Sequence, residues 1–418
     1  MESIAMKYTP EEKQELLSKN GSFCMLPWVS MHVTPVGVGT PCCIGNQLYP
    51  VGNANEKSLI ELVNSEAMKE LRRDMLEGIK NPICKACHRH EEQGIYSFRN
   101  NMNEEQMFGQ FFDEALASTD ITGEIGKFKM RYFDLRLSNI CNMKCRTCNS
   151  HYSSQWENED AKQGRTIITI DKDNRSKYVD DVLQQIPHIT MAYFAGGEPL
   201  ITEEHYIMLE EMIRQGRTDV RLRYNTNLSN LKFKNKDLLD LWSHFTKKIE
   251  VYASLDHYGS RAEYMRKGTD WKQIEENFKK VKSVPYVATQ INSVLSIFNF
   301  VTFSTFYHYL LNKNFYTPED RSNTIYNMIS PEHIAALALP VHLKIQGIEG
   351  IETVITRMKM MGFKPHHVQP LVDAKKWVLA DNTWERHKEQ FQKETLHLDN
   401  LREEQFANVF PELEELLT

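Results

Sequence analysis

Short apolar runs alternate with helical patterns through the middle of this chain, from about residue 129 to 335. Six of the runs have the length and composition of strands: Arg131–Leu137, Thr190–Ala195, Arg221–Asn225, Ile249–Leu255, Ala288–Ile297 and Thr324–Met328. Between them lie amphipathic patterns such as Glu203–Arg214 and Trp271–Val281. Strands that alternate with helices form a parallel sheet with right-handed crossovers. The pattern therefore predicts an α/β fold, with fewer than the eight units that close a TIM barrel.

The segment before this region has a different pattern. A short hairpin is expected around Pro35–Gly39, where glycine and proline punctuate two apolar stretches. Ser58 and Glu61 have capping-box spacing, which predicts the start of a single helix that runs on through Met75. The stretch Met102–Gly126 is expected to be a partly helical linker.

After Pro331 the pattern becomes largely helical up to the C-terminus. The last part, Trp384–Leu417, is heavily charged, which predicts a solvated helical face. We therefore divide the chain into three parts: residues 1–128, 129–335 and 336–418.

Composition and charge narrow the class of protein. A length of 418 residues allows two or three domains, and a net charge of −6 gives no sign of a nucleic-acid surface. No apolar run is long enough to span a membrane, and Met1–Lys7 lacks the apolar core of a signal peptide. We expect a cytoplasmic protein with neither nucleic acid nor a membrane as partner.

The cysteines carry the most specific chemical signal. All eight lie between residues 24 and 148, and clustered cysteines in a reducing compartment are typical of metal sites rather than disulfides. Cys141, Cys145 and Cys148 have the spacing C-x3-C-x2-C. Three thiolates can hold three corners of a 4Fe–4S cube, which leaves the fourth iron free to bind and reduce a small molecule.

A second motif, Gly196-Gly197-Glu198-Pro199, follows the second predicted strand. Together with the three cysteines it resembles the radical S-adenosylmethionine (radical SAM) enzymes. The resemblance implies a partial (β/α)6 TIM-like barrel whose strand ends carry a 4Fe–4S cluster and bind SAM. It also implies reductive cleavage of SAM to a 5′-deoxyadenosyl radical, which abstracts a hydrogen atom from a substrate.

The same resemblance suggests where SAM is bound. Gly196 and Gly197 would let the backbone approach the methionyl group, and Glu198 would accept hydrogen bonds from its ammonium. The remaining expected SAM contacts are Pro199, Asn227, Ser254, Asp256, Arg266, Ser293 and Asn327. Apart from Pro199, each is equally compatible with a strand-end cap or a solvated polar group. Thr147 stands where many family members have an aromatic residue next to the adenine.

Five further cysteines precede the barrel. The order of Cys24, Cys42, Cys84 and Cys87 resembles the SPASM/twitch extension, which holds an auxiliary 4Fe–4S cluster and usually follows the barrel. Cys43 remains: it could replace Cys42 as ligand, donate a hydrogen atom, or be a small buried residue. His88 and His90 are expected not to be ligands, since four cysteines suffice. A structural zinc site is the alternative for this region.

These observations predict a radical SAM oxidoreductase. Hydrogen abstraction from a peptide or protein side chain is expected, followed by oxidation through the auxiliary cluster. A small metabolite such as a sugar or aminocyclitol is the alternative substrate, and a flavodoxin- or ferredoxin-type protein is the expected electron donor. No catalytic acid or base is identified. The alternative from another class is a zinc-binding scaffold protein.

Overall fold

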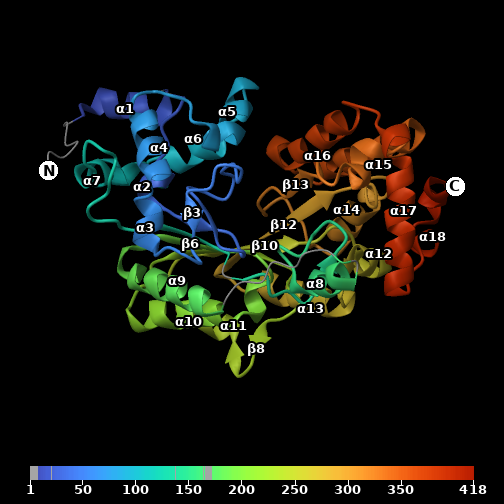
Figure 1. The fold of residues 1–418 in the computed structure, drawn as a ribbon. Helices are drawn as coiled ribbons and strands as arrows, with labels where there is room; N and C mark the ends of the chain where they lie inside the picture. The colour runs from blue at the N-terminus through green and yellow to red at the C-terminus, as the bar shows by residue number, and fades with distance from the viewer. Residues whose placement is uncertain (1–7, 20, 137, 163, 165–171) are drawn as a thin grey trace.

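The computed structural model describes residues 8–19, 21–136, 138–162, 164 and 172–418 (Figure 1). Leu137, the last residue of the first predicted strand, and Met1–Lys7 lie outside the described residues. In Figure 1 the N-terminal helices in blue and the C-terminal helices in red lie on opposite sides of the central strands. The part of the chain that the structure describes contains no helix with the length and apolarity needed to cross a membrane.

Six parallel strands form the centre of the molecule, as the apolar runs predict. In sheet order they are β13 (Thr324–Asn327), β12 (Val287–Leu295), β10 (Ile249–Ser254), β7 (Arg221–Thr226), β6 (Met191–Phe194) and β4 (Tyr132–Leu135). Every neighbouring pair in this set is parallel. The fold is therefore the expected α/β type with a partial TIM-like barrel.

The two faces of these strands differ in polarity. Along β7, Leu222, Tyr224 and Thr226 are buried, whereas the residues that alternate with them are only partly buried. Tyr224 stacks on Phe194 of β6, and its hydroxyl lies 3.0 Å from Nε2 of His205 in helix α10 (Glu203–Arg214). Because successive side chains of a strand point to opposite faces, the apolar face packs against the helices and the other face is polar.

Helices and short strands connect the barrel strands. The helices are α8 (Ser154–Lys162), α9 (Lys172–Gln184), α10, α11 (Leu238–Trp242), α12 (Gly259–Met265), α13 (Trp271–Lys282) and α14 (Phe303–Asn312). The short strands are β5 (Lys144–Cys145), β8 (Lys232–Phe233), β9 (Lys236–Asp237) and β11 (Arg266–Lys267). The predicted helix at Glu203–Arg214 has the observed bounds, and the one at Trp271–Val281 ends one residue later.

The N-terminal region continues the barrel sheet. Strand β1 (His32–Val33) pairs in parallel with β4, where Val33 faces Leu135. Strands β2 (Val38–Thr40) and β3 (Gly52–Asn53) extend the same sheet in antiparallel pairs, so that it has nine strands in total. The expected hairpin is therefore present, and it is built onto the barrel. Our division at residue 128 remains a proposal about domains, across which one sheet runs.

One expectation for the N-terminal region is wrong, and a second is met only in part. The single helix predicted from Ser58 onward is two helices, because Ser65 caps a second one by accepting a hydrogen bond from the Met68 amide. The stretch expected to be a partly helical linker does contain a helix, but Phe112 of that helix is fully buried in the core. The helices of this region are α1 (Pro10–Ser18), α2 (Leu26–Val29), α3 (Leu59–Val63), α4 (Glu66–Leu76), α5 (Lys85–Glu92), α6 (Phe98–Asn103) and α7 (Phe112–Ala117).

The C-terminal region is helical, as expected, but its charged part is not simply a solvated face. Asp399 and Arg402 in α17 are 7% and 5% exposed, and Phe391 of the same helix is completely buried. Their partners are charged side chains near the cysteine loop of the barrel, a pairing that no local pattern predicts. The helices are α15 (Val341–Met360), α16 (Pro365–Val378), α17 (Trp384–Arg402) and α18 (Phe406–Val409), followed by the 3₁₀ segment η7 (Pro411–Leu417). Shorter 3₁₀ segments occur elsewhere: η1 (Pro82–Cys84), η2 (Gly109–Phe111), η3 (Ile186–His188), η4 (Pro199–Ile201), η5 (Glu332–Ile334) and η6 (Ala336–Ala338).

Candidate functional site

The loop after β4 brings three of the predicted thiols together. Cys145 is buried in β5, and Cys141 and Cys148 are partly buried on either side of it. Burial, followed by the effect of the neighbouring Cys145, raises the pKa of both Cys141 and Cys148 to about 12. The three sulfurs are therefore close enough to influence one another. A metal cluster would offset the raised pKa values, because it binds all three cysteines as thiolates.

The Gly-Gly turn after β6 lies directly on this loop. The amide of Gly197 donates to the Ser138 carbonyl (3.0 Å), and the amide of Glu198 donates to the Ile140 carbonyl (2.8 Å). A Cβ atom at Gly197 would lie 2.2 Å from the Ile140 carbonyl oxygen, and Gly196 has a φ of +117°. Both positions require glycine, because the turn and the cysteine loop are in backbone contact.

Glu198 connects this turn to the end of β7. Its side chain is buried, and Oε1 accepts hydrogen bonds from the Thr226 hydroxyl (2.6 Å) and the Leu200 amide (3.1 Å). Oε2 accepts from the Asn227 amide (2.7 Å). Burial raises the pKa of this carboxyl to about 7. Sequence reasoning expected Glu198 to receive the SAM ammonium, whereas here three donors of the chain itself hold it.

Asn227 connects the end of β7 to the cysteine loop. Its Nδ2 donates to Oδ1 of Asn142, which lies between Cys141 and Met143 (3.0 Å). Asn142 in turn donates to the Ser229 hydroxyl (2.9 Å). The cysteine loop, the Gly-Gly-Glu-Pro turn and the turn after β7 thus share one hydrogen-bond network.

Arg266 approaches the same loop from β11. This strand pairs with β5, so that Arg266 faces Cys145, and Nη1 lies 3.8 Å from its sulfur. Nε donates to Oδ2 of Asp256 (2.8 Å), which is fully buried. Burial alone would disfavour the guanidinium, but the Asp256 carboxylate outweighs it and raises the pKa of Arg266. A permanent cation therefore lies beside the thiols, suited to an anionic cluster or a carboxylate ligand.

The remaining expected SAM contacts differ in whether their side chains are free to bind a ligand. The hydroxyl of Ser293 is used internally, since it donates to the Leu255 carbonyl (2.6 Å). Ser254 is partly buried at the end of β10. Asn327 ends β13, and its Oδ1 is buried without a hydrogen-bond partner among the described residues. Because buried polar atoms are normally paired, Asn327 is the member of this set that most clearly needs a ligand.

A pocket of about 350 Å³ borders the cysteine loop on the side of α17. It is lined by Thr147, Cys148 and Phe298, among others. Phe298 therefore places an aromatic side chain in the same pocket as Thr147, the position where the family resemblance led us to expect an aromatic residue.

The N-terminal cysteines form a second group. Burial, followed by the nearby Cys84, raises the pKa of Cys24. The pKa of Cys42 is raised by burial and then by Cys43, Cys24 and Cys84, and that of Cys84 reaches about 12 through burial and Cys87. The fold thus brings together all four predicted ligands. His88 and His90 are not needed to complete this set.

A zinc site and an iron–sulfur cluster require different spacings of the cysteine sulfurs. Four thiolates around one zinc ion would lie within about 4 Å of one another, since each Zn–S bond is about 2.3 Å. Across the described ranges, no three histidine, cysteine, aspartate or glutamate side chains are arranged to hold a single metal ion. A cubane spreads its ligands further apart, because each thiolate binds a different iron.

Two sets of supporting residues were not found from the sequence. Asn103 of α6 accepts from the Met25 amide (2.9 Å) and donates to the Phe23 carbonyl (2.9 Å), so it fixes the backbone around Cys24. Arg146, next to Cys145, bonds to Asp399 (2.5 Å) and Glu404 (2.8 Å) of the C-terminal region. The partners are 78 to 258 residues apart in the chain, and no local pattern identifies such pairs.

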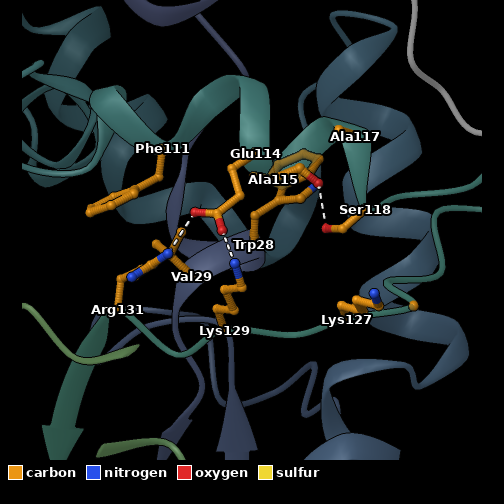
Figure 2. A pocket seen from close by; sticks show the side chains of 11 residues that line it. Trp28, Val29, Phe111, Glu114, Ala115, Ala117, Ser118, Lys127, Lys129 and Arg131 are labelled. Atoms are coloured by element: carbon orange, nitrogen blue, oxygen red, sulfur yellow. Dashed lines mark hydrogen bonds and ion pairs between the residues drawn. The ribbon is translucent and has the colours of Figure 1, made fainter. Parts of the chain in front are cut away.

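Figure 2 shows another pocket, whose lining includes none of the side chains described above. It has a volume of about 440 Å³ and is bordered by Trp28, Phe111 and the ion pairs of Glu114 with Lys129 and Arg131. Arg131 precedes β4, so this pocket is at the opposite end of that strand from the cysteine loop. None of the predicted site residues lines it.

Comparison with family models assigns both regions. Residues 135–300 match the radical SAM superfamily, and residues 24–88 match the SPASM iron–sulfur cluster-binding domain. The first range contains the C-x3-C-x2-C loop and the Gly-Gly-Glu-Pro turn, and the second contains all five N-terminal cysteines. No curated protein matches the chain.

Solved structures with some likeness to this chain include two of anSMEcpe. The native protein with bound AdoMet has 18% identity and a TM-score of 0.39, over 56% of this chain and 62% of that chain. The complex with AdoMet and the Cp18Cys peptide has 18% identity and a TM-score of 0.36, over 55% and 61%. TYW1 with a lysine-pyruvate adduct has 12% identity and a TM-score of 0.28, over 55% and 71%. The chain thus spans about three fifths of the length of the first of these proteins.

Proposed function

We propose that this chain, a radical SAM enzyme with an N-terminal SPASM domain, abstracts a hydrogen atom from a substrate held on the polar face of its barrel. Its cofactors are SAM, a SAM-binding 4Fe–4S cluster and an auxiliary 4Fe–4S cluster. When bound, the first cluster supplies the electron that cleaves SAM to methionine and the 5′-deoxyadenosyl radical.

Cys141, Cys145 and Cys148 are the proposed ligands of the SAM-binding cluster. Cys24, Cys42, Cys84 and Cys87 are the proposed ligands of the auxiliary cluster. The observation that carries the first assignment is the network that joins the cysteine loop to the Gly197 turn, to Asn227 and to Arg266. The second assignment is supported by the match of residues 24–88 to the SPASM domain. Such a network holds ligands in place before the cofactor binds.

The proposed SAM contacts are supported by different observations. Gly196 and Gly197 offer backbone close to the cysteine loop, and Arg266 offers a cation beside Cys145 that suits the SAM carboxylate. Asn327 offers an unpaired oxygen at the end of β13. We assign Glu198 and Asp256 mainly to positioning, because donors of the chain already occupy their oxygens. Pro199, Asn227, Ser254 and Ser293 complete the proposed set.

The polar face of the barrel supports a polar substrate. Arg223 and Glu250 form an ion pair across it (2.7 Å), and the Arg223 guanidinium lies 5.2 Å from the ring centroid of Tyr252. We propose a peptide or protein side chain as substrate, since peptides are frequent substrates of enzymes with this domain pair, and a sugar or aminocyclitol as the alternative. The expected ending is oxidation of the substrate radical, with the auxiliary cluster as electron acceptor. A flavodoxin- or ferredoxin-type protein is the proposed electron donor.

The test is anaerobic reconstitution followed by iron and sulfide analysis and an assay of SAM cleavage with dithionite. We expect about eight irons per chain and formation of 5′-deoxyadenosine. In Cys145→Ala the 5′-deoxyadenosine should be lost, while Cys148→Ser reports whether oxygen can replace one thiolate. Persistence of the product in Cys145→Ala would contradict the ligand assignment. Colourless protein with bound zinc would instead support the scaffold alternative.

A further inference from the structure

The pocket in Figure 2 has largely apolar walls. Its volume of about 440 Å³ lies within the range of about 300–1,000 Å³ that is usual for small-molecule sites. Trp28 and Val29 of α2 and Ala115 of α7 line it, and all three side chains are buried. The indole N–H of Trp28 donates to the Thr119 hydroxyl (3.1 Å), so the indole needs no further polar partner. A flat apolar group that enters this space would displace water without breaking that hydrogen bond.

Three basic residues follow one edge of the pocket. Lys127, Lys129 and Arg131 alternate along the chain with residues whose side chains are buried in the core. Successive side chains of an extended segment point to opposite sides, so the three cations share one side of the chain. In Figure 2 they lie in a row along the lower edge of the view. The apolar walls are thus bordered by a positively charged rim.

Glu114 offsets only part of this charge. Its Oε2 lies 2.6 Å from Nη2 of Arg131, and its Oε1 forms an ion pair with Nζ of Lys129. Lys127 is exposed, and its side chain has no ion pair or hydrogen bond among the described residues. The lining therefore carries three positive charges against one negative charge, in a chain whose net charge is −6. This local excess suits an anionic group, and Lys127 is the cation left to pair with it.

The pocket keeps its shape without a ligand. The Arg131 guanidinium lies 4.5 Å from the ring centroid of Phe111, and its Nη1 donates to the His188 carbonyl (2.9 Å). Together with the Glu114 ion pair, these contacts fix the side chain on three sides. Because the wall is already ordered, little conformational entropy would be lost when a ligand binds.

We propose that this pocket binds a small molecule with a flat apolar body and a carboxylate group. The apolar body rests against Trp28 and Ala115, and the carboxylate pairs with Lys127. The site is separate from both cysteine groups, since no cysteine lines it and it is at the opposite end of β4 from the cysteine loop. The inference therefore goes beyond the proposed function and does not depend on it.

The experiment uses 1-naphthoate as the probe and its neutral counterpart 1-naphthamide as the control ligand. Each is titrated by calorimetry into the reconstituted full-length protein, with SAM in excess so that its own site is filled. 1-Naphthoate should bind at one site per chain, and about two- to five-fold more tightly than 1-naphthamide, because only the carboxylate pairs with Lys127. At about 1 M NaCl this ratio should approach one, since salt screens the charge pair. Absence of binding by both compounds, or equal affinities at low salt, would overturn the proposal.

Two variants locate the bound probe. Lys127→Gln should weaken 1-naphthoate binding to the level of 1-naphthamide and leave 1-naphthamide binding unchanged. Ala115→Leu adds carbon atoms to the wall and should abolish binding of both compounds. Because Lys127 is exposed, its substitution does not disturb the core, and this comparison decides the question even if Ala115→Leu does not fold.

Lys280→Gln is the matched control. Lys280 is an exposed lysine of α13 whose side chain also has no ion pair among the described residues, and it does not line the pocket. Both affinities should therefore equal those of the wild-type protein. Wild-type affinities in Lys127→Gln, or an equal loss in Lys280→Gln, would show that the probe binds elsewhere and would overturn the proposal.

Discussion

The two cysteine groups of this protein are assembled in different ways. In the barrel, three thiols lie in one short loop, and polar side chains from the ends of neighbouring strands hold that loop in place. In the N-terminal region, the cysteines come from segments as far apart as Cys24 and Cys87, and α6 fixes the first of these segments. The first group therefore depends on local spacing and the second on the complete fold. Variants that affect one group and leave the other intact test this difference.

The largest expected effect is at Cys84. In Cys84→Ala the auxiliary cluster loses a thiolate, so iron content should fall from about eight to about four per chain. SAM cleavage should persist in large part, because the barrel loop is not involved. Iron analysis and the 5′-deoxyadenosine assay on the same sample check both points. Full iron content would contradict the role of Cys84, and complete loss of cleavage would show that the two groups are not independent.

The next effect concerns the contact between the barrel loop and the C-terminal helix. Arg146→Met leaves Asp399 and Glu404 without their buried cation, and breaking such a pair costs about 3–5 kcal/mol. Urea unfolding of the apoprotein measures this loss. Arg386→Met in the same C-terminal helix is the control, because the Arg386 side chain is 73% exposed and its removal should cost less than about 0.5 kcal/mol. Equal stability of the two variants would mean that the buried contact does not hold the loop.

The raised pKa of Glu198 predicts that the free energy of unfolding depends on pH. Its pKa is raised to about 7 in the folded protein, from an ordinary value of 4.5, so the folded state favours the neutral carboxyl. The stabilisation is complete below about pH 4.5 and is lost as pH rises through 7. Relative to Glu198→Gln, the free energy of unfolding of wild-type apoprotein should fall by up to about 3 kcal/mol over this range.

Glu203→Gln is the control for this pH series. Its hydrogen bond with Lys234 lowers the pKa of Glu203, so stabilisation by this residue grows as pH rises. Urea titrations of the three proteins at several pH values separate the two trends. A flat difference between wild type and Glu198→Gln would mean that the Glu198 carboxylate stays ionised, satisfied by its three donors.

The smallest effect is expected at the support of the auxiliary site. Asn103→Ala removes hydrogen bonds to the backbone around Cys24 and should cost about 2 kcal/mol. Chelator challenge of the reconstituted protein should then release the auxiliary iron faster than in wild type. Asn101→Ala in the same helix should release it at the wild-type rate, since the side chain of Asn101 has no hydrogen bond among the described residues. Equal release from both variants would argue against Asn103 as a support.

Local periodicity and residue spacing were enough to predict the barrel strands, the cysteine loop and the Gly-Gly turn. The alternation of apolar runs with helical patterns gave all six barrel strands, because buried parallel strands need apolar side chains whatever surrounds them. The C-x3-C-x2-C spacing and the Gly-Gly turn identified the loop and the turn that meet it, since both depend on short-range geometry. The break between α3 and α4 was visible only as Ser65, whose capping role competes with helix propensity.

Only the tertiary structure decided which distant groups meet. It attached the N-terminal hairpin to β4 and paired Arg146 with Asp399. Neither arrangement follows from the sequence, because each depends on long-range packing. The residues next to a side chain in the sequence do not reveal which distant group it will contact. The chain thus encodes its cysteine spacing and its Gly-Gly turn in short motifs, and the fold determines which distant side chains support them.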